Sequence, residues 1–226
     1  MYVYFRKKFE WKKLCLDGLV CSGKTSVCRE LADELPVMCN DYKQRAYQQR
    51  FKDKWKILKM YLDLPTQLLA TCSQNIDLQT AEHVIMDTSP LSDIWINYVF
   101  AIKCKYKTLA DFTTFINTDY AKDICSYFPS FFVVIDKSDY EAFDDILNMT
   151  EDNDYYINGE GMSYNFLNIH LDLLYEIKKA NIPNFYFFNK PKYVPMYTES
   201  CQNLLKNQLV KSFLMIESKN KFNFSK

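Results

Sequence analysis

The stretch LCLDGLVCSGKTSVCREL, residues 14–31, joins an apolar run to a helical pattern through a turn that contains two glycines. Within it, GLVCSGKT at residues 18–25 matches the pattern G-x-x-x-x-G-K-[ST] in full. In such a loop the glycines let successive backbone N–H groups face a phosphate, and the following helix adds its dipole. The lysine neutralises the outer phosphates, and the threonine hydroxyl can hold Mg²⁺. The stretch therefore predicts a strand, a phosphate-binding loop and a helix.

This loop is the main candidate for a cofactor site. The residues predicted to bind a nucleotide are Gly18, Ser22, Gly23, Lys24, Thr25 and Ser26. The alternative is a coincidental strand–turn–helix with glycine at its bend. Only four glycines occur in the chain, and two of them stand at the required positions before Lys24 and Thr25. We therefore favour nucleotide binding.

Composition limits the partners of the chain. Its 226 residues suffice for one domain with a two-sided core, so we expect a single domain over residues 1–226. Basic and acidic residues balance at 28 each, which argues against nucleic acid or an anionic membrane surface as a partner. No segment approaches the roughly 20 apolar residues of a membrane helix. The eight cysteines stand singly, without metal-ligand spacing, and indicate free thiols in a reducing, cytoplasmic compartment.

Apolar runs of strand length alternate with longer segments of helical period, the pattern of a parallel sheet covered by helices. The expected strands are residues 13–18, 36–41, 83–87, 131–136 and 184–189. The expected helices are residues 25–35, 42–61, 65–80, 91–105, 109–127, 140–149, 164–180 and 199–216. Ser138 or Asp139 is expected to cap the helix after the fourth strand. This order predicts an α/β fold of three layers, α/β/α, around a five-stranded parallel sheet with ligands at the carboxyl ends of its strands.

A carboxylate at the end of the third expected strand points to a metal ion. HVIMD at residues 83–87 is an apolar strand that ends in Asp87. Proteins with a phosphate-binding loop use such an acid for the Mg²⁺ ion that accompanies the nucleotide. We therefore predict Thr25 and Asp87 as Mg²⁺ ligands. The alternative is that Asp87 only ends the strand, as acidic residues commonly do.

Small GTPases can be excluded. NKPK at residues 189–192 imitates the start of their guanine-reading motif N-K-x-D. However, Lys192 stands where the aspartate is required, and no D-x-x-G follows the strand that ends in Asp87.

Three features resemble one kinase superfamily: LDGLVCSGKT at residues 16–25, an acid after the second expected strand, and IMDTSPLSD at residues 85–93. They resemble the deoxynucleoside kinase and thymidylate kinase superfamily, which includes the thymidine kinase-like proteins of large DNA viruses. Its members end this strand with D-R-S or E-R-S before a helix. The resemblance implies a P-loop NTPase fold and ATP- and Mg²⁺-dependent phosphorylation of a deoxynucleoside such as thymidine. For a viral protein, it implies the host cytoplasm or nucleus.

The resemblance also implies catalytic residues beside Lys24. Asp41 stands where the family keeps an acid that accepts the proton of the acceptor's 5′-hydroxyl. The alternative for Asp41 is a helix N-cap, and the two roles are compatible. Independently of the resemblance, Arg45 lies one turn into the next expected helix and is a candidate source of catalytic positive charge in place of the family's arginines.

The substrate-binding residues implied by the resemblance are Gln67, Asp87, Trp95 and Tyr98. The Gln67 amide offers a donor and an acceptor to the edge of a base. Its alternative role is that of a solvent-facing helical glutamine. Trp95 and Tyr98 stand at spacings where the family places an aromatic against the base, and their alternative role is packing in the core.

The chain departs from the family pattern at two places. Thr88 stands at the arginine position of D-R-S, and a threonine hydroxyl cannot supply the arginine's charge or its fork of donors. The expected lid over ATP, residues 148–161, carries no lysine or arginine. Indeed, residues 138–177 contain ten acidic residues and no basic one except His170. An acidic lid is repelled by a triphosphate unless metal ions intervene.

These departures leave three hypotheses. The first is an active kinase that binds a nucleoside substrate and ATP. The second is a degenerate homologue that binds a nucleotide without transferring phosphate. The third is a kinase that acts on thymidylate or another nucleoside monophosphate. The apolar helices expected at residues 65–80 and 91–105 also allow a homodimer, although the same faces can pack on the sheet.

Overall fold

The computed structural model describes residues 13–34, 38–41, 84–87, 89, 91–126, 128–151 and 164–223. Its strands are β1 (Lys13–Gly18), β2 (Met38–Asp41), β3 (Val84–Asp87), β4 (Ser130–Val134) and β5 (Phe185–Asn189). Its helices are α2 (Lys24–Glu34), α7 (Ser92–Lys103), α8 (Leu109–Ile116), α9 (Asp119–Ser126), α10 (Tyr140–Glu151), α11 (Tyr164–Lys179) and α12 (Glu199–Asn223). The predicted α/β fold with a parallel sheet is confirmed.

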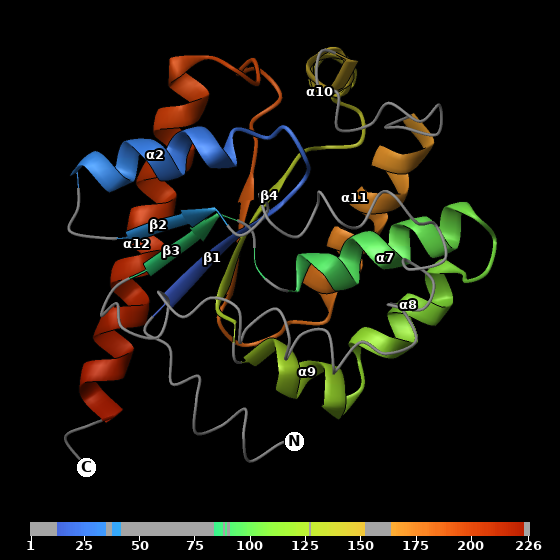
Figure 1. Ribbon diagram of the computed structural model, residues 1–226, viewed down its shortest axis with the longest axis horizontal. Coiled ribbons are helices and arrows are strands. Elements are labelled where there is room, and N and C mark those ends of the chain that lie inside the picture. Colours follow the sequence, from blue (N-terminus) through green and yellow to red (C-terminus); the bar gives the residue numbers. More distant parts are fainter. Residues whose placement is uncertain are drawn as a thin grey trace.

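The strands form one sheet in the order β2-β3-β1-β4-β5, with every neighbouring pair parallel. Successive side chains of a strand point to opposite faces, so each buried strand serves two cores. Leu14 and Leu16 of β1 and Phe131 of β4 join a core with α2 and α12. Cys15 and Phe132, one position along, join a second core with α7 to α11. Figure 1 shows these two groups of helices on opposite sides of the strands.

The carboxyl ends of β1 and β3 flank a switch point of the sheet. These two strands are neighbours, with Leu16 paired in register to Asp87. The chain leaves β1 toward α2 on one face, and it leaves β3 toward α7 on the other. Ligands of open α/β sheets bind in the crevice that such a divergence creates. The fold therefore places the predicted phosphate-binding loop at the position where a ligand is expected.

The prediction of one continuous helix over residues 109–127 is wrong, because two helices, α8 and α9, occupy this segment. Asn117 and Thr118 break it with their side chains. Asn117 Nδ2 donates to Thr113 O at 2.8 Å, and Thr118 Oγ1 accepts from Ala121 N at 3.1 Å. Asparagine and threonine compete with the helical backbone in this way and favour a cap over a helix interior.

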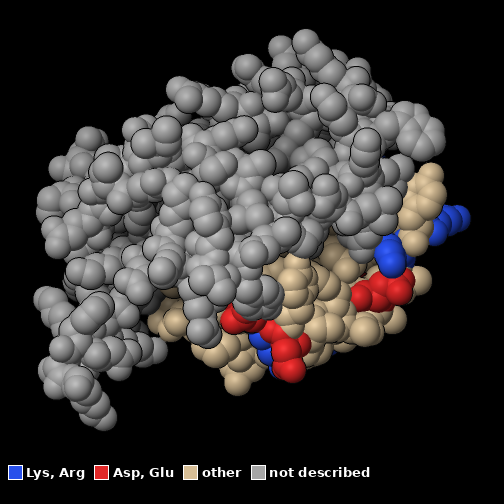
Figure 2. Space-filling view, turned by 60° about the horizontal axis from the view of Figure 1, so that its bottom comes forward, with Lys and Arg blue, Asp and Glu red and all other residues tan. Residues whose placement is uncertain are grey.

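Helix α7 packs inward. Its Ile94, Trp95, Tyr98 and Val99 side chains are buried in the second core, which is the larger of the two. The helix packs against α8 and α11 there. This is the internal packing that the sequence left open as the alternative to a dimer contact. No helix among the described residues is long and apolar enough to cross a membrane. On the described part of the face in Figure 2, acidic and basic side chains lie beside one another in a mostly uncharged surface.

Candidate functional site

The loop between β1 and α2 turns through left-handed backbone at three residues. Gly18 has φ 116°, Cys21 has φ 51° and Gly23 has φ 81°. A Cβ atom on Gly18 would lie 2.3 Å from Val133 O in β4, so glycine is also required there by the packing of the sheet. A Cβ on Gly23 would meet no heavy atom within 4 Å. Gly18 thus sits tightly against β4, whereas Gly23 is flanked by open space.

Hydrogen bonds inside the loop hold its shape. Ser22 Oγ donates to Leu19 O at 2.7 Å. Lys24 Nζ donates to Leu19 O and lies 3.2 Å from Ser22 Oγ, with only 5% of the residue exposed. Leu19 N donates to Val133 O at 3.3 Å, which ties the loop to β4. The ammonium group therefore sits among oxygen acceptors of the loop, which phosphate oxygens can replace.

The first turn of α2 completes an anion site. The first backbone N–H groups of a helix have no acceptor within it, and the helix dipole is positive at this end. Thr25 and Ser26 lie in this turn and are exposed. With the cation of Lys24 and a glycine at residue 23, this turn fits the phosphate chain of a nucleotide.

The two residues predicted to bind Mg²⁺ belong to elements that meet at the same edge of the sheet. Thr25 is the second residue of α2, and Asp87 is the last residue of β3, the strand beside β1. Mg²⁺ is usually held by one or two protein ligands together with phosphates and waters. No cluster of three or more His, Cys, Asp or Glu residues is found among the described residues. The role of Thr25 and Asp87 as Mg²⁺ ligands stays a prediction.

Asp41 ends the edge strand β2 at the same height as Asp87, because the two residues are paired in register. The two acids and the loop therefore end three neighbouring strands, β2, β3 and β1. The catalytic role of Asp41 stays a prediction. The remaining predictions of this region, namely Arg45, Gln67, Thr88, the helices at residues 42–61 and 65–80, and residues 152–161 of the lid, lie outside the described residues.

Trp95 and Tyr98 lie in the core. They are 1% and 6% exposed, and both contact the Phe112 ring of α8, at centroid distances of 5.9 and 4.8 Å. These contacts account for both residues as core packing. Their role in binding a substrate stays a prediction.

Asp17 is a buried residue of the site that the sequence reasoning missed. Its carboxylate, on a residue only 1% exposed, accepts hydrogen bonds from Ser89 N at 3.1 Å and from Ser89 Oγ. Ser89 Oγ in turn accepts from Leu91 N at 3.1 Å, at the start of α7. Asp17 thereby joins the end of β1 to the segment after β3, across the switch point. The available signal was an acid inside the apolar strand LCLDG, since a buried charge requires donors around it.

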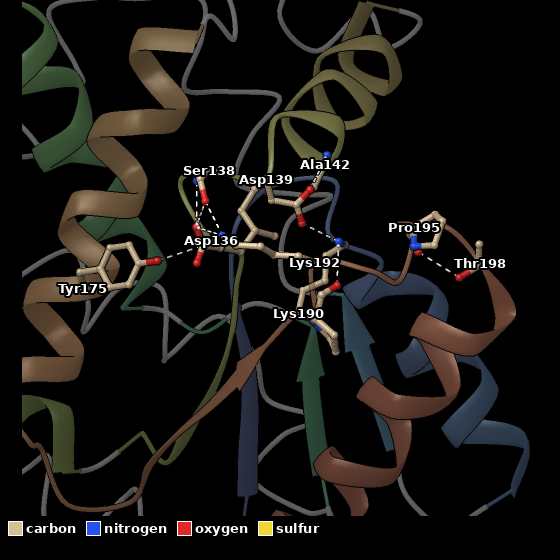
Figure 3. Close-up of polar contacts among 11 residues, drawn as sticks. Asp136, Ser138, Asp139, Ala142, Tyr175, Lys190, Lys192, Pro195 and Thr198 are labelled. Carbon is tan, nitrogen blue, oxygen red and sulfur yellow. Dashed lines mark hydrogen bonds and ion pairs between the residues drawn. The ribbon is translucent and has the colours of Figure 1, made fainter.

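A second buried polar contact links the ends of β4 and β5 (Figure 3). Lys190 Nζ lies 2.6 Å from Asp139 Oδ2, with side chains 1% and 4% exposed. Asp139 Oδ1 accepts from Ala142 N at 3.2 Å, which confirms Asp139 as the cap of α10. Lys190 also donates to Pro191 O at 3.1 Å. The pair therefore anchors the N-terminal end of α10, the helix whose last residues belong to the predicted lid.

An exposed ion pair lies beside this buried one. Lys192 Nζ is 3.3 Å from Asp136 Oδ1, and the two side chains are 55% and 48% exposed. Hydrogen bonds from Ser138 Oγ at 2.6 Å and Ser138 N at 2.9 Å lower the pKa of Asp136, and Lys192 adds to the effect. The two lysines at this edge, Lys190 and Lys192, are thus both paired with acids.

Comparison with known proteins identifies the fold. No protein-family model and no curated protein matches the sequence. Deoxyadenosine kinase from M. mycoides with bound dATP matches with a TM-score of 0.57 and 18% identity, over 87% of this chain and 98% of that chain. Two further structures of that kinase match at a TM-score of 0.55, each over 88% of this chain and 99% of theirs. One holds the products dCMP and a flexible dCDP, at 17% identity, and the other holds dCTP, at 16% identity. The chain therefore has the same fold as this deoxyadenosine kinase.

Proposed function

We propose that this protein is an ATP-dependent deoxynucleoside kinase. The observation that carries the proposal is the loop at residues 18–25, whose left-handed residues and buried Lys24 at the switch point are suited to binding phosphate. The nucleotides bound to the matching deoxyadenosine kinases support a nucleoside or nucleotide as its substrate. Thymidine is the acceptor that the sequence resemblance favours, and deoxyadenosine is the one suggested by the names of the matching structures.

The proposed roles follow from the sequence resemblance and, for Lys24, Thr25, Asp41 and Asp87, also from their places at the ends of helices and strands. Lys24 exchanges the loop carbonyls for the outer phosphates of ATP, and the first turn of α2 holds the remaining phosphate oxygens. Thr25 and Asp87 would hold the Mg²⁺ ion, which would neutralise charge that develops during transfer. Asp41, at the end of β2, accepts the proton of the acceptor's 5′-hydroxyl. Arg45 supplies positive charge to the transferring group.

The composition of the lid favours a second candidate, a homologue that binds nucleotide but transfers no phosphate. No lysine or arginine occurs in residues 138–177, although phosphoryl transfer needs cations around the moving group. The pairing of Lys190 and Lys192 with acids adds to this deficit. Under this hypothesis the loop still binds ATP.

A phosphoryl-transfer assay separates these candidates. The acceptors are thymidine, deoxyadenosine, deoxycytidine, deoxyguanosine and thymidine monophosphate, each with ATP and Mg²⁺. We expect turnover with at least one deoxynucleoside, and Lys24→Ala should slow it by at least about 100-fold, since it removes a cation from the phosphate site. Lys179→Ala is the control, because Lys179 Nζ pairs with Glu176 on the exposed end of α11 and its side chain is 72% exposed.

The outcomes exclude different hypotheses. No turnover with any acceptor, combined with ATP binding, would leave only the degenerate homologue. Turnover with thymidine monophosphate alone would favour the nucleoside monophosphate kinase. Turnover that survives Lys24→Ala at the level of Lys179→Ala would contradict a role of this loop in transfer.

A further inference from the structure

The connection between β5 and α12, residues 190–198, contacts the phosphate-binding loop from outside. Tyr197 Oη donates a hydrogen bond of 2.5 Å to Cys21 O, across 176 positions of the sequence. Cys21 is one of the three loop residues with left-handed backbone, and it is the one that is not glycine. A non-glycine residue in this conformation requires support from its surroundings. Tyr197 supplies a contact at this strained residue.

Both ends of this connection are anchored. Lys190 N donates to Val134 O at 2.9 Å, and its side chain forms the buried pair with Asp139. At the other end Thr198 Oγ1 accepts from Cys201 N at 3.3 Å in the first turn of α12, and Thr198 Oγ1 donates to Pro195 O at 2.9 Å (Figure 3). Met196, beside Tyr197, is 4% exposed in the larger core. The hydroxyl of Tyr197 is therefore presented to the loop from a fixed backbone.

The Tyr197 hydroxyl is a permanent donor at neutral pH. Burial raises the pKa of Tyr197 above its ordinary value, and the neighbouring groups Cys21 and Asp145 raise it further. The phenol consequently stays protonated throughout the range in which the protein is assayed. Asp145 lies in α10, so Tyr197 stands near both the loop and the helix that leads to the predicted lid.

The bond to Cys21 O has a consequence for the next amide. In a planar trans peptide unit the C=O and N–H bonds point in opposite directions. A hydroxyl that holds Cys21 O therefore directs the N–H of Ser22 away from Tyr197. We propose that Tyr197 is a positioning residue, which orients the Ser22 amide toward a phosphate group bound in the loop. This inference rests on the proposed function, since it takes the triphosphate of ATP as the ligand.

The chain offers a matched control for this contact. Tyr175 Oη donates to Ile135 O at 3.2 Å, so Tyr175→Phe and Tyr197→Phe each remove one hydroxyl that binds a backbone carbonyl. Both tyrosines are partly buried. Tyr197→Phe removes the donor to Cys21 O in the loop, whereas Tyr175→Phe removes the donor to Ile135 O outside it.

The experiment has two readouts on the full chain. Amide hydrogen exchange without nucleotide should be faster at residues 19–26 in Tyr197→Phe and unchanged there in Tyr175→Phe. Titration with ATP and Mg²⁺ should show about two- to ten-fold weaker binding in Tyr197→Phe, the range expected for one lost hydrogen bond. Binding of the acceptor deoxynucleoside should be unchanged, because the acceptor does not occupy the loop.

Several results would overturn the inference. Exchange and ATP affinity equal to those of the wild type would do so, and so would faster exchange without any loss of ATP affinity. Equal losses for ATP and for the acceptor would indicate a general disturbance instead of a positioning role. A wild-type protein that binds no ATP would overturn the proposed function itself, whereas ATP binding that is equally tight in Tyr197→Phe would overturn only the role of Tyr197.

Discussion

Asp139→Asn should lower the free energy of unfolding by about 3–5 kcal/mol, because it leaves the ammonium of Lys190 buried without a counter-charge. The two side chains are 4% and 1% exposed, so water cannot take over the role of the carboxylate. Asparagine keeps the shape of the side chain and can still cap α10. Its single oxygen then accepts from Ala142 N and no longer from Lys190 Nζ, so the loss reports on the missing counter-charge and the missing acceptor together, with the cap retained. Urea unfolding followed by circular dichroism measures it.

Two further variants test the physical reason. Asp136→Asn removes the same charge from the exposed pair with Lys192, and it should leave the free energy of unfolding nearly unchanged. Adding Lys190→Met to Asp139→Asn should recover most of the stability, since no buried charge then remains. Equal losses for Asp139→Asn and Asp136→Asn would show that burial does not set the cost of breaking the pair.

Gly18→Ala should also be strongly destabilising, by at least about 3 kcal/mol, since overpacking and backbone strain both contribute. The new Cβ would lie 2.3 Å from Val133 O and 2.5 Å from Val133 N, both of which belong to the backbone of β4. These atoms cannot move without disturbing the pairing of β4 with β1 and β5. The φ of 116° adds strain for any residue with a side chain.

Gly23→Ala separates the two contributions. Gly23 also has a positive φ, at 81°, but its added Cβ would meet no heavy atom within 4 Å. Its cost should be limited to the backbone strain, about 1–2 kcal/mol. Thermal and urea unfolding of both variants measure the difference. If Gly23→Ala were as destabilising as Gly18→Ala, the contact with β4 would not be the cause.

Much of the fold could be predicted because its strands and long helices are strongly patterned. Strand β1 has the predicted bounds, and the other four strands begin and end within two residues of their predicted positions. The break between α8 and α9 was missed because the pattern of apolar residues continues across it. That break depends on how the Asn117 and Thr118 side chains bond to nearby backbone, which the period of a helix does not record.

The site was predictable only where its residues are adjacent in sequence. The predicted phosphate-binding loop is one continuous motif, and in the structure it has left-handed backbone at both of its glycines. The contacts that support it join distant residues: Asp17 binds Ser89, Asp139 binds Lys190, and Tyr197 binds Cys21. Nothing in the local pattern specifies such pairs, because they depend on which strands become neighbours in the sheet.

The balance between holding and transferring phosphate is the central functional question. The structure supports phosphate binding, because the loop is already folded and the Lys24 ammonium lies among its oxygen atoms. Transfer requires positive charge around the reacting group, and residues 138–177, which include the predicted lid, contain no lysine or arginine. An active enzyme must therefore draw charge from Mg²⁺ and from residues such as Arg45.

Isothermal titration with ATP and Mg²⁺ measures directly whether the loop at residues 18–25 holds a triphosphate. The wild-type protein should bind one ATP in a saturable manner, and Lys24→Ala should weaken this binding by at least about ten-fold, because a charged hydrogen-bond donor is lost. Lys179→Ala should bind ATP as the wild type does. Absence of binding in the wild type, or binding that Lys24→Ala leaves unchanged, would contradict the account.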